Sequence, residues 1–508
     1  MELQPLMILG TGSDVGKSVV AAAFCRIFRQ DGYTPAPFKA QNMALNSFAT
    51  PEGLEIGRAQ AMQAEAAGIP CHTDMNPVLL KPTADRMCQV VLNGKPIGNR
   101  SAYEYFNGEG REELWSAATS AFDRIAAKHN PVVLEGAGSI SEINLWDRDI
   151  VNLPMASYAN AACILVADID RGGVFGSLYG SIMLLPENYR RLVKGIIINK
   201  FRGDIRLFED GRRMVKELCG VPVLGVIPHF SDIKLDEEDS VMLTQKRRSA
   251  AKGKVNVAVV LLRHMSNFTD FNALESDERI NLYYVSEPEQ LAEADAIIIP
   301  GTKNTIADLL DLRSRGLAAA IMAHHQAGKS VVGICGGFQM MGRTISDPLG
   351  VEAGIVEVPG LAILPVDTVM EAEKVTRQVE FRFRDGEERC TGYEIHMGRT
   401  TGSPESVNRL LDGAVDGCWL SSGCYGTYMH GIFDNRSVVD ALVAPFTSTK
   451  SNQQSYADFK EQEYDRLAEH FRRNLDMERV YEIMRQCANV PICQCGNVLI
   501  QIKGVRRS

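Results

Sequence analysis

Short hydrophobic runs alternate along the first half of the chain with longer segments of helical periodicity. Runs of a few residues without polar positions are typical of strands that are buried on both faces of a parallel sheet. We therefore expect these runs to form one doubly wound α/β sheet. They are Leu6–Leu9, Val132–Leu134, Cys163–Ala167, Ile196–Ile198 and Val223–Ile227.

A second series of hydrophobic runs begins after a charged stretch of small residues at 244–254, which we expect to be a linker. The later segment Tyr456–Arg485 is polar and charged, with the pattern of surface helices. We expect the second series to build another doubly wound domain. Its runs are Val255–Leu262, Leu282–Val285, Ala296–Ile299, Val331–Ile334, Val375–Phe383 and Tyr425–Met429.

The predicted organisation is thus α/β, with two mostly parallel-sheet domains. A chain of 508 residues exceeds what one hydrophobic core usually organises, in agreement with this division. We place the first domain at 1–243, the linker at 244–254 and the second domain at 255–445. A helical extension and tail at 446–508 follow, and nothing in the sequence indicates what the tail does or which oligomer forms.

Charge and targeting signals restrict the function further. The net charge of −9 gives no electrostatic reason for binding nucleic acid or an anionic membrane. The first ten residues lack the basic and apolar regions of a signal peptide, and no apolar run is long enough for a membrane span. We expect a cytoplasmic enzyme that acts on small molecules, with most of its twelve cysteines as buried thiols.

A glycine-rich turn follows the first predicted strand and precedes the amphipathic segment Val19–Phe28. In this context, backbone N–H groups and a helix N-terminus face bound phosphates. Lys17 is expected to neutralise phosphate charge, and the Ser18 hydroxyl to bind Mg²⁺. Gly10 lies six positions before Gly16, and this long loop resembles that of the dethiobiotin synthetase-like ATPases, which activate carboxylates. The expected ATP contacts here are Gly10, Thr11, Gly12, Gly16, Lys17 and Ser18.

Polar residues at the ends of other predicted strands support an ATP site, because open α/β sheets bind ligands at the carboxyl ends of their strands. Glu135 is a candidate Mg²⁺ ligand, the alternative being an unpaired surface carboxylate. Lys39 is a second candidate phosphate contact. Asn199 either reads the purine edge or is a simple turn residue. The turn Asp168–Gly173 is a candidate metal or substrate loop.

A cysteine stands at a sharp predicted turn, between the strand Val331–Ile334 and a helix that opens at Phe338. Glycines on both sides of Cys335 permit the tight backbone that exposes a nucleophile, and the helix N-terminus favours the thiolate. A buried inert cysteine, the alternative, needs no such glycines. The N–H groups of Gly336 and Gly301 are candidate donors of an oxyanion hole.

A cysteine nucleophile needs a base from elsewhere in the chain. His430 ends an apolar strand and precedes a glycine, which makes it one candidate. His396, at the end of Gly392–His396, is the competitor. The residues alone do not decide between a catalytic and a structural histidine.

Together these motifs resemble a class I glutamine amidotransferase domain joined to an ATPase domain. The whole chain, over roughly residues 5 to 485, resembles the cobyric acid synthase family, glutamine-hydrolysing amidases of cobalamin biosynthesis. Most class I domains carry a glutamate two residues after the catalytic histidine, where this chain has Ile432. That places it with the subgroup that lacks the third member of the triad, and leaves open what orients His430. The segments that carry the resemblance are Lys39–Ser47, Met75–Pro82, Asp168–Gly176, Ser266–Phe271 and Gly392–His396.

The resemblance implies that Cys335 and His430 release ammonia from L-glutamine. It also implies that ATP and Mg²⁺ activate carboxylates of a corrinoid, adenosylcobyrinic acid a,c-diamide. The amides then form at its b, d, e and g carboxylates to give adenosylcobyric acid. No tightly bound organic cofactor is expected, and ammonia is expected to pass between the domains. Candidate corrinoid contacts are Gln41, Asn42, Asn46, Ser47, Asn76 and Lys81.

Three other functions share parts of this pattern. Cobyrinic acid a,c-diamide synthases have both domains but are expected to lack the segment Gln41–Ser47. CTP synthases keep the glutamate that Ile432 replaces. P-loop switches and partitioning ATPases, which act by binding, usually carry a second lysine near the start of the loop, where this chain has Thr11.

Overall fold

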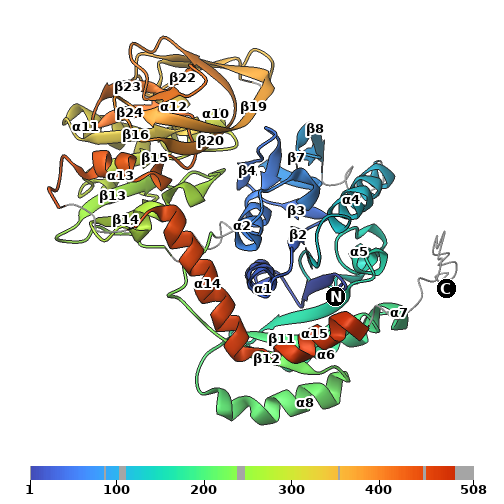
Figure 1. Cartoon of the computed structure of the whole chain (residues 1–508). Helices are drawn as coiled ribbons and strands as arrows, with labels where there is room; N and C mark the ends of the chain where they lie inside the picture. The colour runs from blue at the N-terminus through green and yellow to red at the C-terminus, as the bar shows by residue number, and fades with distance from the viewer. Residues whose placement is uncertain are drawn as a thin grey trace.

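The computed structural model of the chain describes residues 2–84, 87–101, 110–236, 246–352, 355–449 and 454–486. The tail cysteines Cys487, Cys493 and Cys495 lie outside the described residues, as do the first two residues of the expected linker. Each half of the chain contains one mostly parallel sheet, and helices connect many of its successive strands (Figure 1). The predicted α/β class with two doubly wound domains is confirmed.

The sheet of the first half pairs its strands in parallel, in the order β12-β11-β10-β1-β9-β2. Every hydrophobic run predicted for this half is one of its strands, and a short strand ending at Phe38 forms the edge. The strands are β1 (Leu6–Gly10), β2 (Ala36–Phe38), β9 (Val132–Glu135), β10 (Ala162–Asp168), β11 (Val193–Phe201) and β12 (Val223–Pro228).

Helices cover both faces of this sheet because alternate residues of each buried strand point to opposite sides. Met7 and Leu9 pack with one group of helices, whereas Leu6 and Ile8 pack with α1 and the C-terminal helices. The carboxyl ends of the central strands remain open to the loops that carry the candidate ATP residues. The helices of this half are α1 (Lys17–Gln30), α2 (Arg58–Ala67), α4 (Arg111–Ala126), α5 (Leu153–Tyr158), α6 (Val174–Met183), α7 (Glu187–Arg190) and α8 (Glu209–Cys219).

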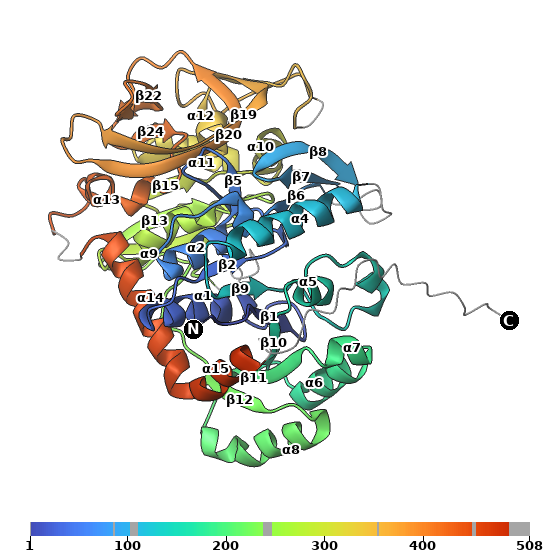
Figure 2. The ribbon, with the colours of Figure 1, turned by 45° about the vertical axis from the view of Figure 1, so that its right-hand side comes forward.

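A smaller, mostly antiparallel layer extends the first half toward the second (Figure 2). It contains a sheet in the order β3-β6-β7-β8 and the hairpin β4–β5. Phe48 on β4 packs against Tyr393 of the second half, with ring centroids 4.5 Å apart. The strands are β3 (Gln41–Met43), β4 (Ser47–Ala49), β5 (Glu55–Gly57), β6 (Val78–Ala84), β7 (Met87–Leu92) and β8 (Lys95–Ser101).

The second half has a sheet in the order β14-β13-β15-β16-β24-β23, parallel except for its edge strand β23. Its core joins all of these strands to α10, α11 and α12. The strands are β13 (Val255–Val260), β14 (Ile280–Val285), β15 (Ala296–Ile299), β16 (Ser330–Ile334), β23 (Cys418–Ser421) and β24 (Cys424–Thr427). The helices are η5 (Phe268–Phe271), α9 (Asn272–Ser276), α10 (Thr305–Ser314), α11 (Leu317–Gln326), α12 (Gly336–Met341), η7 (Ile432–Asp434) and α13 (Arg436–Val443).

The predicted strand Val375–Phe383 is part of a longer strand in a separate, mostly antiparallel sheet. This strand, β19 (Asp367–Phe383), pairs along most of its length with β20 (Cys390–Thr401). The pattern did not reveal its full length because only Thr368 and Met370 are buried in its first part, residues 367–373. The remaining strands are β17 (Thr344–Ser346), β18 (Glu357–Pro359), β21 (Asn408–Leu410) and β22 (Val415–Asp416).

The C-terminal helices α14 (Tyr456–Asn474) and α15 (Met477–Gln486) return to the first half of the chain. In both views α14 runs from the second sheet to the first (Figures 1 and 2). The polar pattern predicts surface helices, but one face of each is buried in the first-half core, where Leu467, Phe471, Val480 and Met484 have no exposed surface. Among the described residues, no helix combines the length and apolar character needed to cross a membrane.

Candidate functional site

The predicted phosphate loop lies between β1 and α1. Lys17 Nζ donates hydrogen bonds to the carbonyl oxygens of Gly12 and Gly138, each at 2.9 Å. A Cβ atom at Gly10 would lie 2.9 Å from that amine, and Gly16 has a φ of 96°, which strongly favours glycine. The loop therefore closes around the lysine amine, and side chains at these glycine positions would disturb it.

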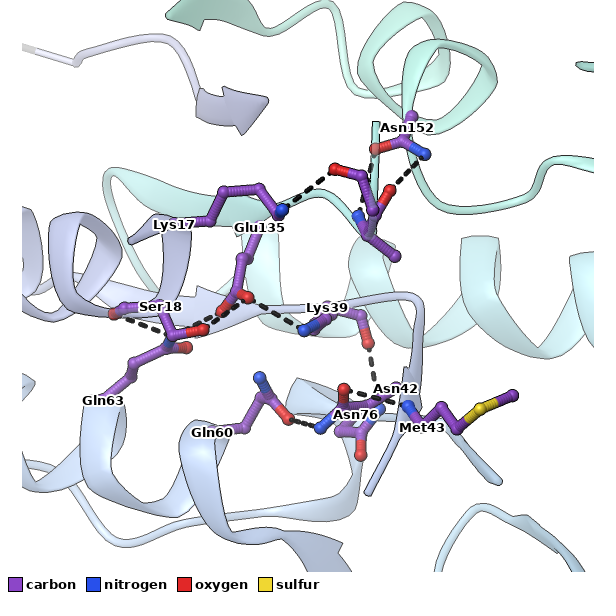
Figure 3. A network of polar contacts seen from close by, with 12 residues as sticks. Lys17, Ser18, Lys39, Asn42, Met43, Gln60, Gln63, Asn76, Glu135 and Asn152 are labelled. Atoms are coloured by element: carbon purple, nitrogen blue, oxygen red, sulfur yellow. Dashed lines mark hydrogen bonds and ion pairs between the residues drawn. The ribbon is translucent and has the colours of Figure 1, made fainter. Parts of the chain in front are cut away.

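Glu135 is the centre of a buried polar network at the end of β9 (Figure 3). Its carboxylate accepts hydrogen bonds from Ser18 Oγ at 2.8 Å, Lys39 Nζ at 2.8 Å and Gln63 Nε2 at 2.6 Å. Burial raises the pKa of Glu135, but Lys39 and these hydrogen bonds bring it below its usual value, so the carboxylate is ionised. The structure thus brings together three predicted residues, and no sequence motif pointed to Gln63.

Asn199, on β11, contacts the phosphate loop that follows β1. Its side-chain nitrogen donates to the Val15 carbonyl at 2.9 Å, and a Cβ on Gly16 would lie 2.3 Å from the same nitrogen. The N–H of Thr11 donates to the Val166 carbonyl at 3.0 Å, which ties the loop to β10. A contact between Asn199 and a purine stays a prediction.

The turn Asp168–Gly173 lies beside the same loop. Lys200 Nζ donates to Asp168 Oδ2 at 2.9 Å, and Arg171 forms an ion pair with Asp14 at 3.2 Å. Arg171 of the turn and Lys200 of β11, which pairs with Asp168, are thus two cations near the phosphate loop.

Two of the residues expected to contact the corrinoid, Asn42 and Asn76, lie beside the Glu135 network (Figure 3). Asn76 Nδ2 donates to the Lys39 carbonyl at 3.1 Å, and Asn42 Nδ2 donates to Gln60 Oε1 at 3.0 Å. Met43 points away from the network and is 54% exposed. Gln41 is half-buried, whereas the other expected contacts are at most 3% exposed. These buried residues are Asn42, Asn46, Ser47, Asn76 and Lys81.

Cys335 lies in a strained turn between β16 and α12. Its backbone has φ 51° and ψ −109°, a conformation that residues with a side chain rarely adopt. A Cβ on Gly337 would lie 2.0 Å from the Ile299 carbonyl oxygen, and one on Gly333 would lie 2.6 Å from Met341 Sδ. The flanking glycines are therefore required by close contacts, as in the nucleophile elbows of hydrolases.

His430 is the histidine that the fold places against Cys335. Asp270 Oδ2 lies 2.7 Å from His430 Nδ1, and Cys335, whose Sγ lies 3.6 Å from the Ile395 carbonyl oxygen, acts on the imidazole through its charge. Burial alone would lower the pKa of His430, but the charges of Asp270 and Cys335 raise it to about 10. The sequence motif that contains Asp270 gave no indication of this contact.

His396, the competing histidine, and Ile432, at the position of the missing glutamate, do not take part in the contacts of His430 with Cys335 and Asp270. His396 stacks on Tyr428, with ring centroids 3.8 Å apart, and its Nδ1 lies 2.8 Å from the Gly398 carbonyl oxygen. Burial lowers the pKa of His396 to about 4. Ile432 has no exposed surface and belongs to the hydrophobic core. The carboxylate that contacts His430 therefore comes from Asp270 and not from the position of Ile432.

Cys335 opens into a cavity of about 240 Å³ that both halves of the chain line. Lys81, Met87 and Gln89 come from the first half, and Lys303 and Cys335 from the second. The N–H of the first residue of α12 has no partner within that helix, so it is available to an oxyanion. This residue is the predicted donor Gly336.

The other predicted oxyanion donor, Gly301, lies against His430. A Cβ atom there would lie 3.0 Å from His430 Cε1. The structure therefore places both expected donors beside the expected catalytic pair.

The oxygen atoms around Glu135 match a cation that binds together with a nucleotide. No group of three or more His, Cys, Asp or Glu side chains in the described ranges is arranged to hold a metal ion. Mg²⁺ that binds with a nucleotide uses one or two protein oxygens together with phosphates and water. The Ser18 hydroxyl and the ionised Glu135 carboxylate, 2.8 Å apart, fit that smaller requirement.

Two protein-family models match this chain, one in each half. The model of the CobQ/CobB/MinD/ParA nucleotide binding domain matches residues 6–241. The model of the CobB/CobQ-like glutamine amidotransferase domain matches residues 256–438. Together they account for both predicted chemistries.

Curated proteins are similar to this chain over nearly its whole length. The cobyric acid synthase of Bacteroides fragilis is 62% identical over 487 residues, which cover 95% of this chain and 98% of that protein. The cobyric acid synthase of Phocaeicola vulgatus is 61% identical over 488 residues, with the same coverage. That of Syntrophobacter fumaroxidans is 49% identical over 508 residues and also covers 95% and 98%.

Proposed function

This chain belongs to the cobyric acid synthase family and is an ATP-dependent, glutamine-hydrolysing ligase of cobalamin biosynthesis, and we propose adenosylcobyrinic acid a,c-diamide as its substrate. The product is adenosylcobyric acid, amidated at the b, d, e and g carboxylates. The substrate follows from the cobyric acid synthase relatives, and the observation that carries the coupling of the two reactions is the cavity of Cys335, because residues of both halves line it. Ammonia released there is already at the boundary with the ATP-binding half.

The first half activates the acceptor, because a free carboxylate is a poor electrophile. A carboxylate oxygen of the corrinoid attacks the γ-phosphorus of ATP, and ADP leaves. Ammonia then attacks the carbonyl carbon of the acyl phosphate, and inorganic phosphate leaves. The N–H groups of Gly10–Ser18 hold the phosphates, and Lys17 and Lys39 neutralise their charge.

We also propose that the Ser18 hydroxyl and the Glu135 carboxylate are the protein ligands of Mg²⁺. When bound, it neutralises phosphate charge. Lys39 keeps Glu135 ionised, and Gln63 holds the second carboxylate oxygen in place. The chain thus presents an oriented carboxylate at the phosphate loop before nucleotide binds.

The second half supplies ammonia. The thiolate of Cys335 attacks the side-chain amide carbon of glutamine, and the N–H groups of Gly301 and Gly336 stabilise the oxyanion. The imidazolium of His430 donates its proton to the departing ammonia. Water then attacks the thioester while His430 accepts a proton, which releases glutamate and restores the thiolate.

Charged groups in the cavity match the amino-acid end of glutamine. The side chain of Lys303 has no hydrogen-bond or ion-pair partner within the described part of the chain, and we assign it to the α-carboxylate. Glu352 lines the same cavity and accepts a hydrogen bond from the Thr305 N–H at 2.8 Å. Burial raises the pKa of Glu352 to about 7, and an α-ammonium group beside it would favour the ionised form.

We assign residues 1–243 to the amidoligase domain, 244–254 to the linker, 255–445 to the amidotransferase domain and 446–508 to the extension. Two separate parallel sheets support this division. The segment Gln41–Ser47 stays our candidate for corrinoid contacts because it follows Lys39 closely in the sequence and exposes Met43. An exposed methionine beside the ATP site suits the apolar edge of a large ring.

The test is incubation of the purified chain with ATP, Mg²⁺, glutamine and the a,c-diamide, with mass spectrometry to count the added amides. We expect the fully amidated product, and no change in mass would reject this substrate. A parallel reaction with Cys335→Ala should lose glutamine-dependent amidation and keep amidation from added ammonia. Full glutamine-dependent activity in that variant would reject the proposed nucleophile.

A further inference from the structure

We propose that Asp270 is the positioning residue that takes the place of the missing triad glutamate and holds His430 for catalysis. This inference rests on the proposed glutaminase reaction. Asp270 belongs to η5, between β13 and β14, and is thus distant in sequence from the position where the family pattern places its carboxylate. The fold nevertheless brings it to the same ring nitrogen.

Both oxygens of Asp270 are engaged in one orientation. Oδ2 lies 2.7 Å from His430 Nδ1, and Oδ1 accepts a hydrogen bond from the Gly431 N–H at 2.9 Å. The side chains of Asp270 and His430 are only 2% and 1% exposed. The carboxylate is therefore held by the backbone beside the histidine, and it cannot rotate away without leaving a buried donor unpaired.

This contact determines which nitrogen of the imidazole faces the thiol. An ionised carboxylate only accepts hydrogen bonds, so Nδ1 must carry a hydrogen atom. Nε2 is then the nitrogen that exchanges a proton with Cys335 and with the departing ammonia. The same carboxylate also stabilises the imidazolium, as a triad carboxylate does in serine proteases.

A second contact limits the tilt of the same ring. Tyr393 stacks on His430, with centroids 5.3 Å apart and an interplanar angle of 23°. The backbones of the two residues also form a two-way pair, His430 N–H to Tyr393 O at 2.8 Å and Tyr393 N–H to His430 O at 3.1 Å. Tyr393 fixes the plane of the ring, and Asp270 fixes its rotation within that plane.

The segment that carries Asp270 is itself attached to the ATP-binding half. The N–H of Ser47 donates to Asn267 Oδ1 at 3.0 Å, and the N–H of Phe268 donates to Asn46 Oδ1 at 3.3 Å. These residues are all buried. The position of the carboxylate, and through it that of the histidine, therefore depends on how the two halves dock.

Asp270→Asn tests the role because it preserves shape. The amide oxygen can still accept from the Gly431 N–H, but the amide nitrogen now donates toward His430 Nδ1. That places the hydrogen atom on Nε2, where it faces Cys335 and cannot accept the thiol proton. We expect the glutaminase kcat to fall by about 10²- to 10⁴-fold with KM for glutamine little changed. Asp270→Glu, which keeps a carboxylate, should retain more activity than Asp270→Asn.

Amidation from added ammonia does not need the histidine, so it should keep its wild-type rate in Asp270→Asn. A second readout is alkylation of Cys335 by iodoacetamide at neutral pH, followed by peptide mass spectrometry. Loss of the imidazolium partner should slow it, because iodoacetamide reacts with the thiolate. Asp434→Asn is the matched control, because Asp434 is a neighbouring carboxylate that lines the cavity next to Asp270.

The outcomes separate this inference from the proposed function. If the wild-type chain hydrolyses no glutamine, the proposed function fails first. If the wild type is active and Asp270→Asn matches it in kcat and alkylation, the positioning role is rejected. Equal losses of ammonia-dependent and glutamine-dependent amidation in Asp270→Asn would also reject it, since they would indicate general misfolding.

Discussion

A buried ion triplet at the boundary of the two domains gives the sharpest prediction for stability. Glu55 on β5 accepts a hydrogen bond from Lys81 Nζ at 2.6 Å and forms an ion pair with Lys374 Nζ, on β19, at 2.5 Å. The three side chains are 0%, 4% and 6% exposed. Burial raises the pKa of Glu55, but the two lysines together hold it below its usual range. One carboxylate thus serves two buried lysine amines from different domains, although burial lowers the pKa of Lys374 to about 7.

The triplet predicts an order of costs. Glu55→Gln leaves both Lys81 and Lys374 without a carboxylate, and breaking a buried ion pair in this way costs about 3–5 kcal/mol. Lys374→Met removes one cation and leaves the Glu55–Lys81 pair intact, so we expect about 1–3 kcal/mol. Lys374→Met leaves one neutral side chain beside an intact ion pair, whereas Glu55→Gln leaves two buried lysines without a counter-charge, so Glu55→Gln should lower the free energy of unfolding more.

Thermal unfolding of the full chain measures this order. The cost of Glu55→Gln corresponds to a fall in Tm of roughly 6–20 °C, at about 2–4 °C per kcal/mol. Glu380→Gln is the matched control on β19, because its ion pair with Arg389 is exposed and such pairs contribute about 0–1 kcal/mol. A cost for Lys374→Met equal to that of Glu55→Gln, or a Glu55→Gln shift no larger than the control, would refute the reasoning.

Four further changes address the separate sites. Glu135→Gln should lower ammonia-dependent amidation about 100-fold while glutamate release is unchanged, measured by product mass and by a glutamate assay. Gly337→Ala places a Cβ 2.0 Å from the Ile299 carbonyl oxygen, so we expect a loss of about 1–3 kcal/mol in urea unfolding together with loss of glutaminase activity. Lys303→Met should raise KM for glutamine about tenfold in steady-state kinetics, without changing ammonia-dependent kcat. The pKa of His430 rises from 6.5 to about 10, so its imidazolium contributes stability that is fully present below pH 6.5 and is lost as the pH rises through 10. A pH series of urea unfolding should show that loss in the wild type and not in His430→Gln.

Much of the fold follows from local patterns, because strands buried on both faces need hydrophobic residues at consecutive positions. Every such run, from Leu6–Leu9 to Val331–Ile334, lies in one of the two parallel sheets. The first part of β19 was less visible because only Thr368 and Met370 are buried there, and the sheet β3-β6-β7-β8 was not predicted although β6 and β7 are largely buried. The packing of α14 and α15 on the first domain depends on tertiary contacts that no local pattern encodes.

The candidate sites divide in the same way. The phosphate loop and the cysteine turn are predictable because their glycines and reactive residues are contiguous in sequence. The partners that orient the reactive groups are not contiguous. Gln63 lies 72 positions from Glu135, and Asp270 lies 160 positions from His430. Only the folded chain shows that these side chains meet, so their identification needs coordinates.

Helix α2 connects the two chemistries through direct contacts. Near its start, the guanidinium of Arg58 lies 4.7 Å from the centre of the Phe48 ring, and Phe48 packs on Tyr393, which stacks on His430. Further along the helix, Gln63 donates to Glu135 at the phosphate loop. A hydrogen-bonded helix keeps its length, so α2 fixes the separation of the two sites. A change that tilts α2 therefore disturbs both activities, whereas changes to the nucleophile or the phosphate loop disturb one.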